Sequence, residues 1–192
     1  MAYLSPAEFV TKMVDTGEAK IHMSTRDTLI RAFMAGAILA LAAVFAVSAS
    51  VMSGSALIGA LLFPVGVCML YLLGFDLLTG VFMLTPLALL DKRPGVTVRG
   101  ILRNWGLVFV GNFLGALTVA GMMAFIFTYG FSVPPGEIGQ KIGHIGEART
   151  LGYAEYGLMG WATIVLRGVL CNWMVSTGVV GAMISTTVGG KV

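Results

Sequence analysis

The sequence predicts an all-α, polytopic membrane helical bundle, and three observations point to that fold class. Hydrophobic residues make up 57% of the 192-residue chain and charged residues only 11%, against about 25% charged residues in ordinary soluble domains. The charges are segregated, since none lies between Arg31 and Asp76 or between Arg103 and Glu137. Four apolar stretches also reach the length of about 20 residues that a membrane-spanning helix needs. We therefore expect lipid to surround most of the chain.

The first element expected is a short amphipathic helix over residues 5–17. It begins at the sequence SPAE, in which Ser5 can cap the helix, Pro6 suits its first position and Glu8 can complete a capping box. Apolar residues then recur at helical spacing on one face, and Gly17 is expected to end the helix. We expect this helix to pack against the membrane surface or the bundle, with a plug over a pore mouth as the alternative.

A single transmembrane domain is expected to cover residues 1–192. Its spans are predicted at about 27–49, 56–90, 102–129 and 157–186. The first span begins too far into the chain, and behind too many acidic residues, to be a cleaved signal peptide. Basic residues precede it and gather again in the 91–103 loop, so the positive-inside rule places both in the cytoplasm. This predicts a multi-pass protein of the inner (cytoplasmic) membrane with a cytoplasmic N-terminus.

Segment 56–90 is too long for one straight crossing. Its 35 residues would form a helix of about 52 Å, against about 30 Å of hydrocarbon. Two full crossings would put the basic 91–103 loop on the wrong side, so the segment must cross once and be interrupted. Its helix breakers are Pro64, Gly74, Gly80 and Pro86. We predict two half-helices joined by irregular backbone near 74–79.

The predicted break contains the sequence GFDLLTG, residues 74–80. Irregular backbone at membrane depth is tolerated only where it is buried in protein or lines a cavity. The N-terminus of a half-helix carries positive partial charge and can hold an anion. Asp76 is expected to cap a helix or to accept hydrogen bonds from loop N–H groups. The hydroxyl of Thr79 can donate to a passing solute, and a bond to its own helix is the alternative.

Polar residues also lie at membrane depth in the third and fourth spans. Gly111 and Gly115 allow close helix approach, and Asn112 between them is expected to bond a neighbouring helix. In the fourth span the sequence LRGVLCNW contains Arg167 and Asn172. An intramembrane arginine is costly and needs a partner, and we favour a structural pair over an anion attractor for Arg167.

Several classes of protein lack support in the sequence. Cys68 and Cys171 lie inside apolar spans and have no metal-ligand spacing, so neither a metal nor another cofactor is expected. No HExxH, P-loop or nucleophile elbow is present, so we do not expect an enzyme. The basic residues fall where topology requires them and lack interleaved aromatic residues, which argues against a nucleic-acid partner.

Four stretches together resemble the formate–nitrite transporter family. They are SPAE, the broken segment FPVG…GFDLLTG, the run NWGLVFVGNFLGAL and LRGVLCNW, in the family's order and at its spacing, and they cover most of residues 4–180. The resemblance implies an aquaporin-like subunit, assembled as a homopentamer with one pore per subunit. It also implies passage of small monovalent anions such as formate, nitrite, hydrosulfide or short carboxylates, often coupled to protons.

The resemblance implies roles for individual residues. Thr79 matches the family's pore threonine, Asn172 matches the asparagine of the fourth-span motif, and the loop that holds Thr79 matches a mobile loop. Positions that match the two hydrophobic constrictions are Phe63, Val67, Leu77, Leu78 and Val175. Gly74, Asp76 and Gly80 are assigned to hold the loop. Hydrophobic constrictions exclude bare charge, so an anion crosses best if it is protonated in transit or briefly stabilised by donors.

The sequence departs from the family pattern at several positions. Phe75 stands where a small residue is usual and Leu78 where an aromatic is usual. The aromatic side chain of the loop is therefore at position 75 and not at position 78. Tyr156 matches the family's vestibule lysine, so we place Tyr156 on the solute path without a positive charge. Arg149 or Lys141 can compensate from the preceding loop, although nothing in the spacing requires it.

The family pattern continues past Lys191 with a second broken helix, which carries a central histidine, and a sixth span. Neither His22 nor His144 lies in a matching motif. The chain is therefore expected to lack the family's C-terminal spans, and we expect a missing part because a half-barrel would expose polar backbone to lipid. The leading hypothesis is a channel or carrier for small monovalent anions. The alternatives are a neutral-solute channel for water, glycerol or ammonia, and a non-transporting membrane assembly subunit.

Overall fold

The computed structural model describes residues 3–191, and within them the chain is helical without a strand. In that part, four helical segments are long and apolar enough to cross a membrane: Thr25–Ser53, Ala56–Leu73, Val98–Phe127 and the continuous stretch Glu137–Ile184. Large apolar side chains are exposed on all of these segments, as expected for helices that face lipid or neighbouring membrane helices. The predicted all-α membrane bundle is confirmed.

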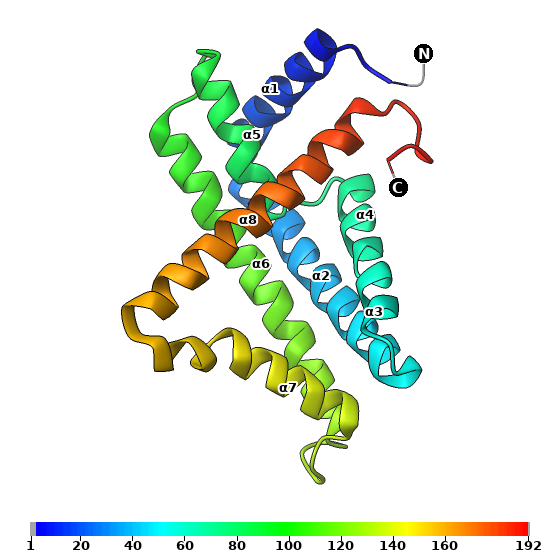
Figure 1. Cartoon of the computed structure of the whole chain (residues 1–192). Helices are drawn as coiled ribbons and strands as arrows, with labels where there is room; N and C mark the ends of the chain where they lie inside the picture. Colours follow the sequence, from blue (N-terminus) through cyan, green and yellow to red (C-terminus); the bar gives the residue numbers. More distant parts are fainter. Residues whose placement is uncertain (1–2, 192) are drawn as a thin grey trace.

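The helices follow one another with short connections. They are α1 (Pro6–His22), α2 (Thr25–Ser53), α3 (Ala56–Leu62), α4 (Pro64–Leu73), α5 (Leu78–Leu90), α6 (Val98–Phe127), α7 (Glu137–Arg149), the 3₁₀ helix η1 (Leu151–Tyr156) and α8 (Gly157–Ile184). Helices α2 and α6 pack along each other, α3 and α4 lie beside α2, and α1 packs on α5 at one end of the bundle (Figure 1). Helix α8 crosses in front of this group and meets α7 at a corner.

Helix α1 begins with the predicted capping box, since the backbone N–H and the hydroxyl of Ser5 donate to the Glu8 carboxylate at 2.8 and 2.6 Å. These two bonds hold the pKa of Glu8 below its usual value. The helix does not end at Gly17, as the sequence predicts, but continues to His22. A Cβ at Gly17 would overlap the Leu84 carbonyl oxygen of α5. This glycine therefore permits close helix contact and does not terminate the helix.

Three glycines bring the backbones of α2 and α6 into contact. A Cβ at Gly36 would overlap the Asn112 carbonyl oxygen, and a Cβ at Gly115 would overlap the Phe33 carbonyl oxygen. Gly111 lies at the same helix contact, where an added Cβ would be 2.5 Å from the Ala32 Cβ and 3.1 Å from the Phe33 nitrogen. The expectation that Gly111 and Gly115 permit close helix approach is confirmed, and the helix they approach is α2.

Gly115→Ala should push α2 and α6 apart and destabilise the protein by about 1–3 kcal/mol, the usual cost of overfilling a packed site. Gly121→Ala on the same helix is the matched control, because no atom lies within 4 Å of a Cβ placed there. In the control, replacing a helical glycine should stabilise by up to about 1 kcal/mol. Thermal unfolding of the purified protein in detergent measures both. Equal melting temperatures for the two variants would contradict the tight seam.

The helix breakers of segment 56–90 behave differently from one another. Pro64 starts α4 and separates it from α3, and Gly74 ends α4. Gly80 and Pro86 both lie inside α5, the second half-helix, and do not interrupt it. A proline is tolerated within a membrane helix where neighbouring groups satisfy the backbone. Pro86 has no N–H for the Phe82 carbonyl, and the Trp105 indole donates in the neighbouring turn, to the Val81 carbonyl oxygen at 3.3 Å and the Thr85 hydroxyl at 2.9 Å.

Candidate functional site

The chain breaks between α4 and α5, at residues 74–77. Gly74 adopts a left-handed conformation with φ of 71°, and its N–H donates to the Tyr71 carbonyl at 3.2 Å. The Phe75 N–H donates to the Leu70 carbonyl at 3.0 Å. Together these bonds close the last turn of α4, in a conformation that favours glycine because it has no Cβ. Helix α5 then starts at Leu78 in a new direction, after an N-cap residue, Leu77, whose apolar side chain makes no capping bond.

The carboxylate of Asp76 is buried at this break, with only 2% of the residue exposed. Its Oδ1 accepts from the Nζ of Lys20, near the C-terminal end of α1, and the side chain of Lys20 is 13% exposed. The sequence predicts a helix cap or a contact with loop N–H groups for Asp76, and the structure has an ion pair instead. A charge in a dry site requires a counter-charge, and α1 supplies it from 56 residues away.

Asn112 of α6 holds the backbone of the break. Its Nδ2 donates to the Asp76 carbonyl and to the Ala32 carbonyl of α2, both at 2.8 Å. Its Oδ1 accepts from the Leu78 N–H at 3.0 Å. One amide therefore joins α2, the break and the first turn of α5, in agreement with the expectation that Asn112 bonds neighbouring elements.

A cavity of about 220 Å³ lies beside the break and is lined by residues of α1, α4, α5 and α8. Of the residues predicted to line a pore, the structure brings together Val67, Leu77, Thr79 and Val175. Gly74, Asp76 and Gly80 also contribute to its wall. The walls are mostly apolar, with the Lys20–Asp76 pair on one side.

Thr79 contributes a hydroxyl to the lining of the cavity. Its Oγ1 is buried and has no partner among the described residues, so it does not bond its own helix. Thr79 lies in the first turn of α5, where the helix N-terminus carries positive partial charge. A buried hydroxyl without a partner costs free energy, and a solute in the cavity would satisfy it.

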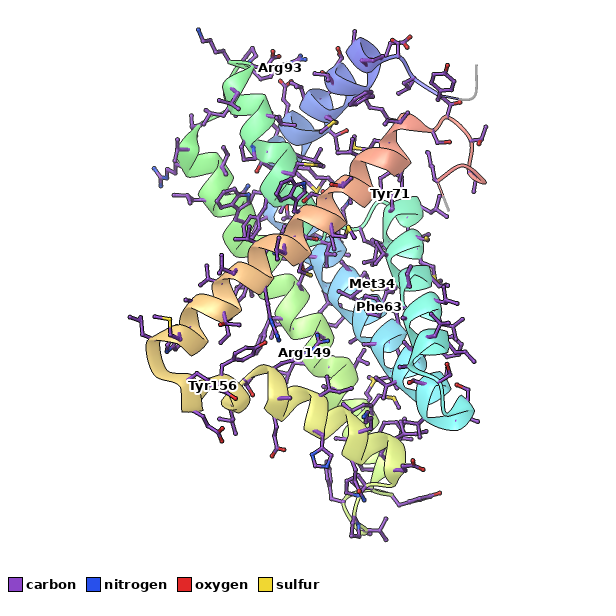
Figure 2. All side chains as sticks on the ribbon, viewed as in Figure 1. Met34, Phe63, Tyr71, Arg93, Arg149 and Tyr156 are labelled. Carbon is purple, nitrogen blue, oxygen red and sulfur yellow. The ribbon has the colours of Figure 1, made fainter. Side chains whose placement is uncertain are left out.

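The remaining predicted site residues lie away from the cavity lining. Leu78 packs against the buried cluster of Ala32, Val81 and Val108, and Phe63 lies between α3 and α4 (Figure 2). Tyr156 lies at the corner between η1 and α8, 67% exposed and remote from the break.

Asn172 of α8 bonds within its own helix. Its Nδ2 donates to the Gly168 carbonyl at 2.8 Å, and its Oδ1 is buried without a partner in the described part of the chain. The amide oxygen therefore keeps acceptor capacity and cannot donate to an anion in this orientation.

Arg167 has the partner that an intramembrane arginine requires. Its Nη1 donates to the Tyr153 hydroxyl at 2.5 Å, and the guanidinium carbon lies 5.5 Å from the centre of the same ring. Tyr153 belongs to η1, so this contact ties η1 to α8. The favoured prediction of a structural pair agrees with this geometry.

Sequence reasoning missed the contribution of α1 to the site. Beside Lys20, the residues Lys12 and Thr16 line the cavity, and Asn104 of α6 donates to the Lys20 carbonyl at 3.0 Å. The rule that an isolated carboxylate in an apolar segment needs a partner points to a basic residue for Asp76. It does not select Lys20 among the basic residues that precede the first span.

Comparisons with known proteins give a consistent result. A family model described as "Formate/nitrite transporter" matches residues 7–192. The chain is 30% identical over 188 residues to "Uncharacterized transporter YrhG" of Bacillus subtilis, covering 93% of the chain and 65% of the relative. It is 29% identical over 209 residues to "Probable formate transporter" of Methanothermobacter thermautotrophicus, covering 100% and 73%.

A third relative is "Formate channel FocA" of Haemophilus influenzae. It is 30% identical to the chain over 185 residues, which cover 92% of the chain and 60% of the relative. The chain therefore spans 60–73% of the length of these three curated relatives. The match includes α1, the break and α8, and so covers every element that lines the cavity.

Proposed function

Since the chain belongs to the formate/nitrite transporter family, we propose that it is a membrane channel or transporter for small monovalent anions such as formate or nitrite. Its apolar helices and its family make it a multi-pass membrane protein. The names of two relatives refer to formate, which supports formate as the first solute to test. Passage coupled to a proton is part of the proposal, because apolar walls favour a neutralised anion.

One observation supports the proposal above the others. The Thr79 hydroxyl is buried without a partner in a cavity of about 220 Å³ at the N-terminus of a half-helix. A hydroxyl donor beside a helix N-terminus suits an anion better than a neutral apolar solute. Val67, Leu77 and Val175 surround it, and such walls remove water from an ion.

The other predicted residues complete the proposed solute path. We assign Asn172 to it from the resemblance; in this orientation its Oδ1, without a partner among the described residues, suits a protonated solute, which can donate, and not the bare anion. Tyr156 is assigned to an entrance, since it is exposed at the corner that precedes α8. Phe63 and Leu78 are assigned to constrictions from the resemblance. Their contacts place them outside the cavity lining, so their roles require movement of the break.

The orientation and assembly of the protein are also proposals. We propose one transmembrane domain over residues 1–192, aquaporin-like in plan, in the inner membrane with the N-terminus in the cytoplasm. The basic residues before α2 and between α5 and α6 support this orientation. A homopentamer is proposed from the resemblance. The exposed apolar side chains of α8 are consistent with burial against other helices or lipid.

Thr79→Val should lower formate flux into proteoliposomes on the order of 10-fold, because valine keeps the volume but removes the donor to the anion. Thr118→Val is the matched control, since the Thr118 hydroxyl donates only to its own helix, to Leu114 at 2.8 Å. Both variants should assemble like the wild type, as judged by size-exclusion chromatography. Equal flux in the two variants would reduce Thr79 to a structural hydroxyl.

The same assay separates the alternatives. A neutral-solute channel would give water or glycerol flux that competing formate does not change, while formate itself would not enter. An assembly subunit would give no flux of formate, nitrite, hydrosulfide, acetate or neutral solutes. The anion proposal fails if the wild-type protein conducts none of the four anions.

A further inference from the structure

The charges around the cavity do not cancel. Among the described residues that line it, the charged side chains are Lys12, Lys20 and Asp76. Lys20 and Asp76 form an ion pair and neutralise each other. Lys12 lies within 4 Å of no described carboxylate, so the cavity carries one uncompensated positive charge. A lysine beside the C-terminal end of a helix is favourable on its own account, but it still leaves the lining of this apolar cavity with a net positive charge.

The ammonium of Lys12 has N–H donors that its contact with the protein does not use. Its half-buried side chain donates from Nζ to the Met183 carbonyl at 3.1 Å, near the C-terminal end of α8. A lysine ammonium has three N–H donors, and this bond uses one. The carbonyl contact fixes the ammonium at the junction of α1 and α8, where it faces the cavity.

The position of Lys12 is also the point at which the cavity meets the surface. A second, open pocket of about 770 Å³ lies along α1 and shares Lys12, Thr16 and Lys20 with the cavity. Two acids line that pocket. Asp15 lies 2.7 Å from an Arg93 nitrogen, whereas Glu8, bonded to Ser5, keeps its negative charge and is offset by Arg31 in the same lining. A solute that enters from this side must therefore pass the ammonium of Lys12.

We propose that Lys12 is the charge-selecting residue of this site: its ammonium captures the anion at the mouth of the cavity before the anion reaches Thr79. This inference rests on the proposed anion-transport function and adds the residue that selects for negative charge. A fixed positive charge in a mouth with low-dielectric walls concentrates anions and speeds their entry by about 10-fold or more. Because this charge acts on the entry step, its effect on flux is largest at low anion concentration.

Lys12→Gln tests the proposal, because glutamine can still donate to the Met183 carbonyl but carries no charge. In proteoliposomes we expect formate flux at low concentration to fall about 10-fold, flux at saturating formate to change much less, and the ionic-strength dependence to flatten. Lys12→Arg keeps the charge and should stay within about 3-fold of wild type. Lys92→Gln in the loop between α5 and α6, an exposed lysine outside both pockets, is the control for a general loss of charge.

Unchanged low-concentration flux in Lys12→Gln would overturn the inference and leave Lys12 as a structural contact between α1 and α8. Should Lys12→Gln fail to assemble, Lys12→His gives the decisive reading: its flux, divided by that of wild type, should fall as the pH rises through about 6.5, where imidazole loses its charge. A pH-independent ratio would count against the proposal. If the wild type conducts none of the four anions, the proposed function fails first and this inference fails with it.

Discussion

Lys20→Met should destabilise the protein by about 3–5 kcal/mol, the cost of leaving one member of a buried ion pair without its partner. Asp76 is 2% exposed and would have no other cation within ion-pair distance among the described residues. In a chain of this length that loss corresponds to roughly 10 °C in melting temperature. Thermal unfolding in detergent, followed by circular dichroism, measures it.

A double-mutant cycle separates this pair from general effects of substitution. Asp76→Asn should cost less than Lys20→Met, because Lys20 is 13% exposed and its long side chain can move its charge to water. The variant with both changes should recover part of the loss, since no buried charge is then left alone. Lys141→Met, on an exposed face of α7, should leave stability unchanged. Strictly additive losses would show that Lys20 and Asp76 are not coupled.

The same pair explains what α1 does. The sequence left two possibilities, packing against the membrane surface or the bundle and a plug over a pore mouth. In the structure Met13 belongs to a buried cluster with Leu84 of α5 and Met183 of α8, and Gly17 lies against the α5 backbone. Lys20 then reaches the break. Helix α1 is a packed part of the bundle, and it also forms one wall of the cavity.

The sequence was most informative where one physical constraint acts along one segment. The break near Gly74 followed from the length of segment 56–90 and the side on which its basic loop must lie. The close approach at Gly111 and Gly115 followed from spacing alone. Both predictions depend on segment length or residue spacing along one helix, and these can be read directly from a single sequence.

Contacts between distant segments were not predictable in the same way. Asp76 was expected to bond locally, and its partner is 56 residues away on α1. Gly17 resembles a helix end in the sequence and is instead a contact with α5. In each case the deciding group comes from another helix, and local patterns do not contain it.

The amide of Asn112 holds the break at its centre, and the loss of stability in Asn112→Leu should measure its contribution. Leucine has a similar volume but cannot accept from the Leu78 N–H or donate to the Asp76 carbonyl. Each unsatisfied buried group costs about 1–3 kcal/mol, so the two together should cost roughly 2–6 kcal/mol. The Ala32 carbonyl, which belongs to a continuous helix, should lose less.

Asn172→Leu is the matched control for this change. Its Nδ2 donates only to a carbonyl of its own helix and its Oδ1 has no partner among the described residues, so its removal should cost less than about 1 kcal/mol. Asn112→Asp adds a sharper test, because a carboxylate keeps the acceptor for Leu78 but places negative charge against two carbonyl oxygens. It should therefore be no more stable than Asn112→Leu, even though it preserves one of the three bonds. Wild-type stability in Asn112→Asp would mean that the bond to Leu78 alone holds the break, and that α2 and the Asp76 backbone are positioned by packing.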